Sequence, residues 1–127
     1  MESRIEFGSF FAHPQAKVAR GVYIGSHCVL GRTSIGERAQ IASGVQILSG
    51  QHQHIREDTG EFHQAGDFTP VTIGADCWIG AGSIVLAEVG NRTTLGAGSV
   101  VVYPLPADSV AVGNPARVVR NTHQRPA

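Results

Sequence analysis

The sequence predicts an all-β solenoid of short strands, because aliphatic residues recur at a step of six along most of the chain. Ten of them follow this register in two blocks, and glycine usually comes next. They are Val18, Ile24, Leu30, Ile35, Ile41, Ile47, Ile73, Ile79, Val85 and Leu95. Strands of a sandwich or barrel differ in length and do not keep one period over two blocks. We therefore expect these side chains to point inward and to stack on one another.

The composition agrees with a lean interior of small and aliphatic side chains. Glycine occurs 16 times in the 127 residues, hydrophobic residues make up 42% and charged residues only 16%. Lysine plus arginine equals aspartate plus glutamate at ten each. This balance gives no overall field that would favour nucleic acid or an anionic membrane, so any anion site must be local.

A single domain is expected over residues 1–127. No apolar run approaches the length of a membrane span, and no hydrophobic segment follows Met1 as in a signal peptide. These observations predict no membrane association and a cytoplasmic location.

The first block of repeats is expected to run from about Val18 to Ile47. His13 and Pro14 precede it, and we expect His13 to have a structural role where the chain approaches the first coil. The step from Leu30 to Ile35 is five residues rather than six, which predicts one shortened edge.

Both cysteines follow a repeat aliphatic by four residues: Cys28 after Ile24 and Cys77 after Ile73. The repeat places a small inward side chain at this position. We therefore expect both thiols to pack as small hydrophobes.

A polar stretch interrupts the repeat between residues 49 and 70. It is rich in His, Gln, Glu and Asp, and the repeat resumes in register at Ile73. A loop of about twenty residues without regular structure is often functional when a rigid scaffold holds it. We therefore expect an excursion at about 49–70 that leaves the solenoid intact.

The second block has an irregularity of its own, because the step from Val85 to Val89 is four residues. No role is assigned to either shortened repeat. After Val101, residues 104–109 are expected to form a turn that leaves the solenoid, and residues 110–120 a terminal segment.

The repeats, together with Gly113-Asn114-Pro115-Ala116-Arg117 in the terminal segment, resemble the hexapeptide-repeat acyltransferases. This family includes the maltose, galactoside and xenobiotic O-acetyltransferases, and the resemblance covers nearly the whole chain. It implies a left-handed parallel β-helix, in which three hexapeptides form one coil of a triangular prism. It also implies acetyl-CoA as co-substrate, no metal, and a homotrimer with active sites between subunits.

His52 is the catalytic residue that the resemblance implies. It lies just after the first block, where the maltose and galactoside acetyltransferases are similar in having a short polar run and then their catalytic histidine. Imidazole titrates near neutrality and can take the proton of a hydroxyl that attacks a thioester. His54 is the competing candidate, and Glu57, Asp58 and Glu61 remain open as groups that orient the base.

The resemblance also implies a set of residues that contact CoA. They are Trp78, Ala81, Ala97, Val102, Tyr103, Arg117 and Arg120. The two arginines would pair with CoA phosphates. Relatives commonly have Thr-Lys where this chain has Val102-Tyr103, so a cation and a hydroxyl are lost, and Tyr103 could instead stack on adenine. Trp78 is interpreted either as a lip of the thioester pocket or as cover for a neighbouring subunit.

The acceptor that family frequency favours is a hydroxyl of a sugar or polysaccharide precursor. Nothing in residues 51–68 selects among such acceptors, or between hydroxyls and amines. The choice of acceptor therefore rests on the resemblance alone.

Two other functions occur on this fold or are compatible with it. A γ-type carbonic anhydrase binds zinc or iron through histidines, and the candidates here are His27, His52, His54 and His63. That family spaces its latter pair as His-x4-His, whereas His52 and His54 are separated by one residue. His27 occupies a position that usually faces solvent. A non-catalytic trimeric scaffold is the other alternative, since fold does not determine function.

Overall fold

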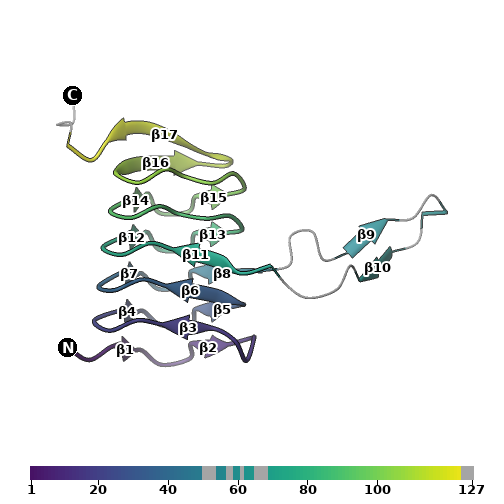
Figure 1. Ribbon diagram of the computed structural model, residues 1–127, viewed down its shortest axis with the longest axis horizontal. Helices are drawn as coiled ribbons and strands as arrows, with labels where there is room; N and C mark the ends of the chain where they lie inside the picture. Colours follow the sequence, from purple (N-terminus) through teal and green to yellow (C-terminus); the bar gives the residue numbers. More distant parts are fainter. Residues whose placement is uncertain (50–53, 57–58, 61, 65–68, 124–127) are drawn as a thin grey trace.

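The computed structural model is a left-handed parallel β-helix with three sheets around one interior, which confirms the predicted fold (Figure 1). It describes residues 1–49, 54–56, 59–60, 62–64 and 69–123. The three sheets form the faces of a prism, and the two termini lie at its opposite ends. Among the described residues, no helix is long and apolar enough to cross a membrane.

The three faces are here named A, B and C in the order in which the chain enters them. Face A contains β1 (Arg4–Ile5), β4 (Tyr23–Ile24), β7 (Gln40–Ile41), β12 (Trp78–Ile79), β14 (Thr94–Leu95) and β16 (Ser109–Gly113), with β17 (Ala116–Asn121) antiparallel to β16. Face B contains β2 (Phe10–Phe11), β5 (Val29–Leu30), β8 (Gln46–Ile47), β13 (Ile84–Val85) and β15 (Val100–Val101). Face C contains β3 (Lys17–Val18), β6 (Thr33–Ile35) and β11 (Val71–Ile73), and isolated bridges continue it through Val89 and Leu105.

Aliphatic side chains form stacked columns inside the prism. On face A, Ile24, Ile41, Ile79 and Leu95 are register partners in successive coils. Nine of the ten predicted repeat aliphatics are at most 1% exposed, and Val18 is partly buried. Complete burial of such a side chain stabilises by roughly 1.5–3 kcal/mol, so these columns are the main source of stability.

The two cysteines pack inside the prism as predicted. Cys28 and Cys77 are free thiols that are 0% and 1% exposed. Burial raises the pKa of the Cys77 thiol, and its Sγ donates a hydrogen bond to the carbonyl of Gly90 at 3.0 Å. Both features make Cys77 unsuited to act as a nucleophile.

The expected start of the solenoid at Val18 is wrong, because two sides of the first coil, β1 and β2, precede it. Strand β1 pairs with β4, β2 pairs with β5, and Ile5 and Phe11 take the inward positions. The repeat is hard to see here, since one column member is aromatic and Glu6 and Ala12 stand where glycine usually follows.

The expected departure from the solenoid at residues 104–109 is also wrong. Leu105 bridges to Val89, is 6% exposed, and continues the face C column. Ala111 follows six residues later as the register partner of Leu95 and is fully buried. The chain therefore completes another coil before the β16–β17 hairpin.

Two of the three corners of the prism have a constant length. From face A to face B the step between column residues is always six, as from Ile24 to Leu30 and from Ile79 to Val85. From face C to face A it is also six, as from Ile35 to Ile41. These are called the AB corner and the CA corner.

The BC corner, between faces B and C, takes all of the length variation. Its steps are seven residues from Phe11 to Val18, five from Leu30 to Ile35, and four from both Val85 to Val89 and Val101 to Leu105. The excursion lies in the remaining step, from Ile47 to Ile73. Both shortened repeats in the sequence therefore lie at the BC corner, in different coils.

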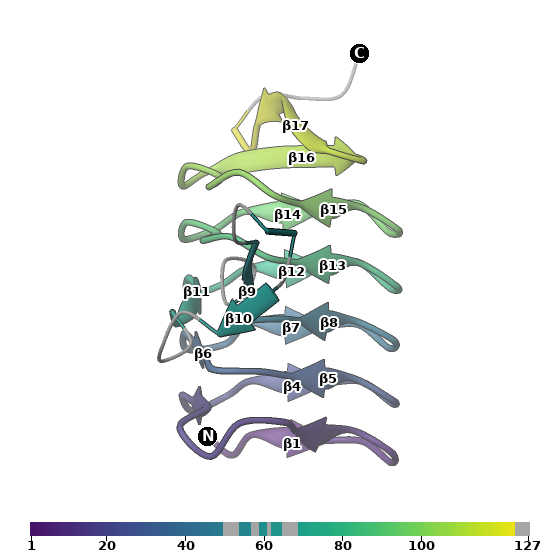
Figure 2. The ribbon, with the colours of Figure 1, turned by 90° about the vertical axis from the view of Figure 1, so that its right-hand side faces the viewer.

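Part of the excursion is regular, contrary to the expected loop without regular structure. Strands β9 (His54–Arg56) and β10 (Phe62–Gln64) form an antiparallel hairpin, with His63 opposite Ile55. The hairpin projects from the BC corner at the level of the central coils (Figures 1 and 2).

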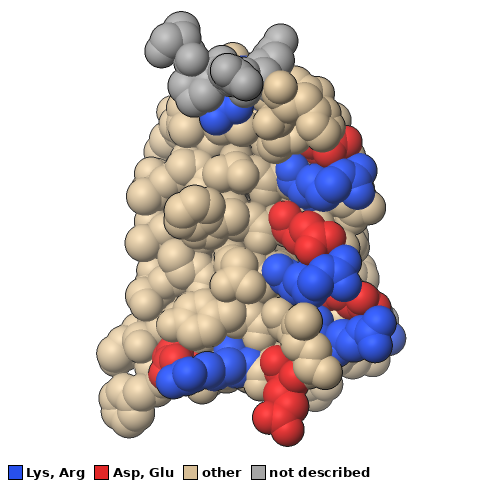
Figure 3. Space-filling model, turned by 90° about the vertical axis from the view of Figure 1, so that its left-hand side faces the viewer, with Lys and Arg blue, Asp and Glu red and all other residues tan. Residues whose placement is uncertain are grey.

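Charged side chains line the CA corner in alternation. Arg38, Asp76, Arg92 and Asp108 each hold the third position of successive turns, with φ between 56° and 60°. Arg38 donates to both carboxylate oxygens of Asp76 at 2.8 and 2.9 Å, and Arg92 to those of Asp108 at 2.8 and 3.2 Å. They form a column of alternating colours in Figure 3. These four residues are called the charge ladder.

Two glycines at the AB corner are required for different reasons, one for close contact between coils and the other for a positive φ. At Gly80 a Cβ would lie 2.5 Å from the backbone nitrogen of Ala97 in the next coil, whereas Gly82 has open space but a φ of +71°. Gly82→Ala is expected to cost roughly 1–2 kcal/mol, the penalty of a Cβ in the left-handed region. Gly80→Ala is expected to cost more, because backbone must move. Urea unfolding measures both.

Gly98 supplies the matched control for this comparison. It has a φ of +70° and open space around an added Cβ, so Gly98→Ala should resemble Gly82→Ala. A Gly80→Ala variant as stable as Gly82→Ala would contradict the proposed close contact between coils.

The charge ladder predicts loss of stability in acid. Hydrogen bonds from Arg38 and Arg92 hold the pKa values of Asp76 and Asp108 below their ordinary value. Because unfolding raises these pKa values again, the stabilisation is present above the unfolded pKa and is lost as pH falls through the folded pKa. We expect urea unfolding to show a shallower acid dependence for Asp76→Asn and Asp108→Asn than for the parent protein.

Glu88→Gln is the control for these two variants, since Glu88 is exposed on the opposite side of the prism and no ion pair involves it among the described residues. High salt should weaken the effect because the pairs are exposed. An acid dependence that Asp76→Asn and Asp108→Asn leave unchanged would contradict the prediction.

Candidate functional site

The BC corner is the candidate site, because the excursion leaves and rejoins the prism there. The backbone N–H of Arg32 donates to Ser49 Oγ at 2.8 Å, just before the excursion. The N–H of Val71, just after it, donates to the Arg32 carbonyl at 2.9 Å. The short corner of the preceding coil thus fixes both ends of the excursion.

The predicted base His52 lies outside the described residues, as do Glu57, Asp58 and Glu61. Its assignment stays a prediction. The competing candidate His54 is in β9, opposite Gln64 in the hairpin. In sequence, His52 is three residues beyond Ser49, whereas His54 is already within the projecting hairpin.

Two predicted CoA contacts come together at the C-terminal end of the prism. Tyr103 lies in the last BC corner and is 57% exposed. The guanidinium carbon of Arg117, in β17, is 4.9 Å from the centroid of the Tyr103 ring. Such a cation–π contact holds the guanidinium beside an exposed aromatic ring. Val102 precedes Tyr103 in the same corner and is half-buried.

Arg120 is placed apart from this pair along the antiparallel β16–β17 ladder. It is the register partner of Val110, whereas Arg117 is the partner of Val112. The hairpin is tied to the prism by the N–H of Gly113, which donates to Ser99 Oγ at 3.1 Å. The predicted use of both arginines by CoA remains a prediction.

Ala81 and Ala97 occupy equivalent positions of the AB corner in adjacent coils. Both are exposed, and the N–H of Gly98 donates to the Ala81 carbonyl at 2.9 Å. Small side chains leave the backbone of this corner accessible to a ligand. This corner and the BC corner border face B on its two sides, so the predicted CoA contacts divide between two edges of one chain.

Trp78 belongs to neither edge. It lies in β12 on face A, is 60% exposed, and borders a shallow hollow of about 380 Å³ with Tyr23, Gln40 and the ladder residues Arg38 and Asp76. The two predicted roles, a pocket lip or cover for another subunit, both stay open.

Two further histidines, His27 and His13, have local structural surroundings. His27 is in the AB corner with a φ of 59°, and its ring meets Phe7 edge-to-face at a centroid distance of 5.8 Å. His13 Nδ1 accepts a hydrogen bond from the N–H of Gln15 at 3.1 Å, which agrees with its expected structural role. In the described part of the chain, no three His, Cys, Asp or Glu side chains are grouped as metal ligands would be.

Lys17 and Arg32, for which the sequence predicts no role, line a hollow of about 500 Å³ beside the excursion. The sequence feature that could have revealed this hollow is the difference in length between the first two BC corners. It becomes informative only when both steps are assigned to the same corner.

Comparison with known proteins gives hexapeptide-repeat relatives. The family description "Hexapeptide repeat of succinyl-transferase" matches residues 70–103. The putative colanic acid biosynthesis acetyltransferase WcaF of Escherichia coli K12 is 34% identical over 72% of this chain and 48% of its own length. Nodulation protein L of Rhizobium leguminosarum bv. viciae is 40% identical over 80% of this chain and 55% of its own length.

The structure of the chain is also similar to a solved acetyltransferase structure. A maltose O-acetyltransferase from Clostridium difficile 630 superposes with a TM-score of 0.60 at 27% identity, covering 91% of this chain and 70% of that chain. The chain spans about half the length of the two curated relatives above.

Proposed function

Because the chain belongs to the left-handed β-helix family of hexapeptide-repeat acetyltransferases, we propose that it transfers the acetyl group of acetyl-CoA to a hydroxyl of a sugar or polysaccharide precursor. One observation carries this proposal most strongly. The excursion that contains His52 and the Tyr103–Arg117 pair both lie on the BC corner, which alone varies in length.

The proposed chemistry begins with His52 as general base. The acceptor oxygen attacks the thioester carbonyl carbon while the imidazole takes the hydroxyl proton. The tetrahedral intermediate then collapses, the carbon–sulfur bond breaks, and the imidazolium returns the proton to the CoA sulfur. Backbone N–H groups can stabilise the intermediate oxyanion because they are fixed donors.

The donor is proposed to lie between two subunits. Ala81 and Ala97 are on the AB corner, whereas Tyr103 and Arg117 are on the far side of face B. If three copies turn face B toward a threefold axis, the BC corner of each subunit lies beside the AB corner of the next. The two groups of predicted CoA contacts then line one groove, and closed C3 symmetry gives three such grooves.

The outward side chains of faces B and C differ in a way that supports the choice of B over C as the interface. On face B, Val29, Ile84 and Val100 present half-buried apolar side chains. The equivalent positions of face C are Lys17, Ser34 and Thr72, all exposed. Burying face B removes apolar surface from water without desolvating a charge on its strands.

The trimer is tested by Ile84→Asp, with Thr72→Asp as the matched control on face C. A carboxylate in the proposed interface must lose its hydration, so Ile84→Asp should dissociate the protein and weaken CoA binding. Thr72→Asp should change neither. Analytical ultracentrifugation and calorimetry with CoA measure the two effects. A parent protein that is monomeric at micromolar concentration would contradict both the trimer and the shared groove.

The assignment of the base is tested by comparing His52→Ala with His54→Ala. Loss of a positioned general base should lower kcat on the order of 10²–10⁴-fold, whereas His54→Ala should change kcat far less. Free thiol released from acetyl-CoA with a panel of sugar acceptors measures the rate, after both variants have been shown to bind CoA. Elemental analysis and activity after chelation should show no dependence on metal.

Other outcomes would redirect the proposal. An inactive His54→Ala beside an active His52→Ala would move the base two residues along the chain. Activity in both variants would remove the excursion from the chemistry. Stoichiometric zinc or iron with loss of activity on its removal would favour the carbonic anhydrase class.

A further inference from the structure

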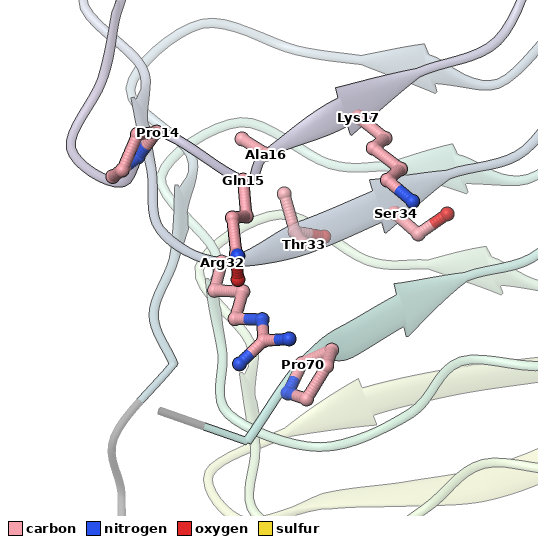
Figure 4. Close-up of a pocket in the computed structure, with 8 residues that line it drawn as sticks. All are labelled: Pro14, Gln15, Ala16, Lys17, Arg32, Thr33, Ser34 and Pro70. Atoms are coloured by element: carbon pink, nitrogen blue, oxygen red, sulfur yellow. The ribbon is translucent and has the colours of Figure 1, made fainter. Parts of the chain in front are cut away.

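We propose that the hollow beside the excursion binds an anionic group, a phosphate or a carboxylate, on the saccharide acceptor. This inference rests on the proposed acetyl transfer and narrows its acceptor to charged sugars. The hollow has a volume of about 500 Å³ (Figure 4). Its lining residues are Pro14, Gln15, Ala16, Lys17, Arg32, Thr33, Ser34 and Pro70.

The hollow arises from the unequal lengths of two stacked corners. The first BC corner takes seven residues from Phe11 to Val18, and the second takes five from Leu30 to Ile35. The longer corner, with Pro14 and Gln15, extends beyond the shorter one and leaves Arg32 set back beneath it. Pro70, where the excursion returns, borders the opposite side.

The described residues that line the hollow carry charge of one sign only. Lys17 and Arg32 line it, and none of its eight lining residues is acidic. Lys17 is the only lysine in the sequence, and it makes no ion pair with any residue that the structure describes.

The neutral groups of the hollow also suit an anion. Ser34 is the register partner of Lys17 on face C, and both side chains are exposed on the same face. Its hydroxyl can donate to a phosphate or carboxylate oxygen. The Thr33 hydroxyl instead donates to the Val71 carbonyl at 2.6 Å, so this buried residue forms the floor.

The position of the hollow links it to the acceptor rather than to the donor. The backbone of Arg32 is hydrogen-bonded to Ser49 and Val71 at the two ends of the excursion. A group bound by the Arg32 side chain is therefore held at the root of the segment that contains the proposed base. The residues predicted to contact CoA lie in later coils, and face C lies outside the proposed trimer interface.

A binding experiment tests the site without any need for turnover. Glucose 1-phosphate, glucuronate and glucose are titrated into the full chain by calorimetry, with and without CoA. The two charged sugars are expected to bind and glucose to bind at least about tenfold more weakly, since hydrogen bonds to charged groups are the stronger ones. Displacement of glucose 1-phosphate by CoA would assign the hollow to the donor and overturn the proposal.

Variants then tie the binding to the two cations. Lys17→Gln and Arg32→Gln should each weaken binding of the charged sugars about tenfold, and Lys17→Arg should retain it. Arg20→Gln removes the same charge at the CA corner, where Arg20 pairs with Glu37 at 3.5 Å, and should have no effect. Unfolding midpoints equal to that of the parent protein identify variants that are correctly folded. Unchanged binding in correctly folded Lys17→Gln and Arg32→Gln would overturn the proposal.

Kinetics separate this inference from the proposed function. For transfer from acetyl-CoA, Lys17→Gln and Arg32→Gln should raise KM for a charged acceptor about tenfold and leave kcat and the KM for a neutral acceptor unchanged. Transfer to charged acceptors that is no more efficient than transfer to neutral sugars, and that neither variant changes, would overturn the anion site and leave the acetyltransferase function intact. Binding of the charged sugars that depends on Lys17 and Arg32, without transfer to any acceptor, would retain the anion site and overturn the function.

Discussion

The register between successive coils is the constraint on which the rest of this molecule depends. Backbone N–H groups of one coil donate to carbonyls of the next, as from Trp78 to Thr93 at 3.0 Å and from Gly80 to Leu95 at 2.8 Å. A slip of one residue in this register would turn inward side chains outward, so any change in length must be confined to a corner. The AB and CA corners therefore stay at six residues, and the BC corner absorbs every insertion and deletion.

Because its length can vary, the BC corner is available for functional side chains, whereas the AB and CA corners serve as framework. The rigid AB corner offers backbone and small side chains such as Ala81 and Ala97, with little room for chemical variety. The variable BC corner offers large and polar side chains, including Tyr103 and the excursion. Because face B separates the two edges, an intact site of the proposed kind needs an edge from each of two copies.

The sequence predicted those features that depend on period alone. The columns of Ile and Leu, the inward Cys28 and Cys77, and the excursion at 49–70 all follow from the step of six. This prediction failed where the inward residue is not Ile, Leu or Val. Phe11 and Ala111 hold inward positions that the aliphatic pattern does not include.

Contacts between coils were beyond the reach of sequence reasoning, because their spacing depends on the variable corner. Arg38 and Asp76 are 38 residues apart and Arg92 and Asp108 only 16, although both pairs join neighbouring coils. The excursion between the first two accounts for the difference. The Arg117–Tyr103 contact and the hollow at Arg32 are hidden in the same way.

A net charge of zero conceals an uneven distribution, and this has consequences for ligand binding. At the CA corner Arg20, Arg38 and Arg92 are matched by Glu37, Asp76 and Asp108, so this edge is close to neutral. Lys17 and Arg117 have no acidic partner among the described residues, and they lie at the two ends of the opposite side. Since exposed pairs cancel beyond about a Debye length of 8–10 Å, the charge ladder adds no field there. Among the described residues, Lys17 and Arg117 are therefore cations that can meet an anionic ligand locally, away from the charge ladder.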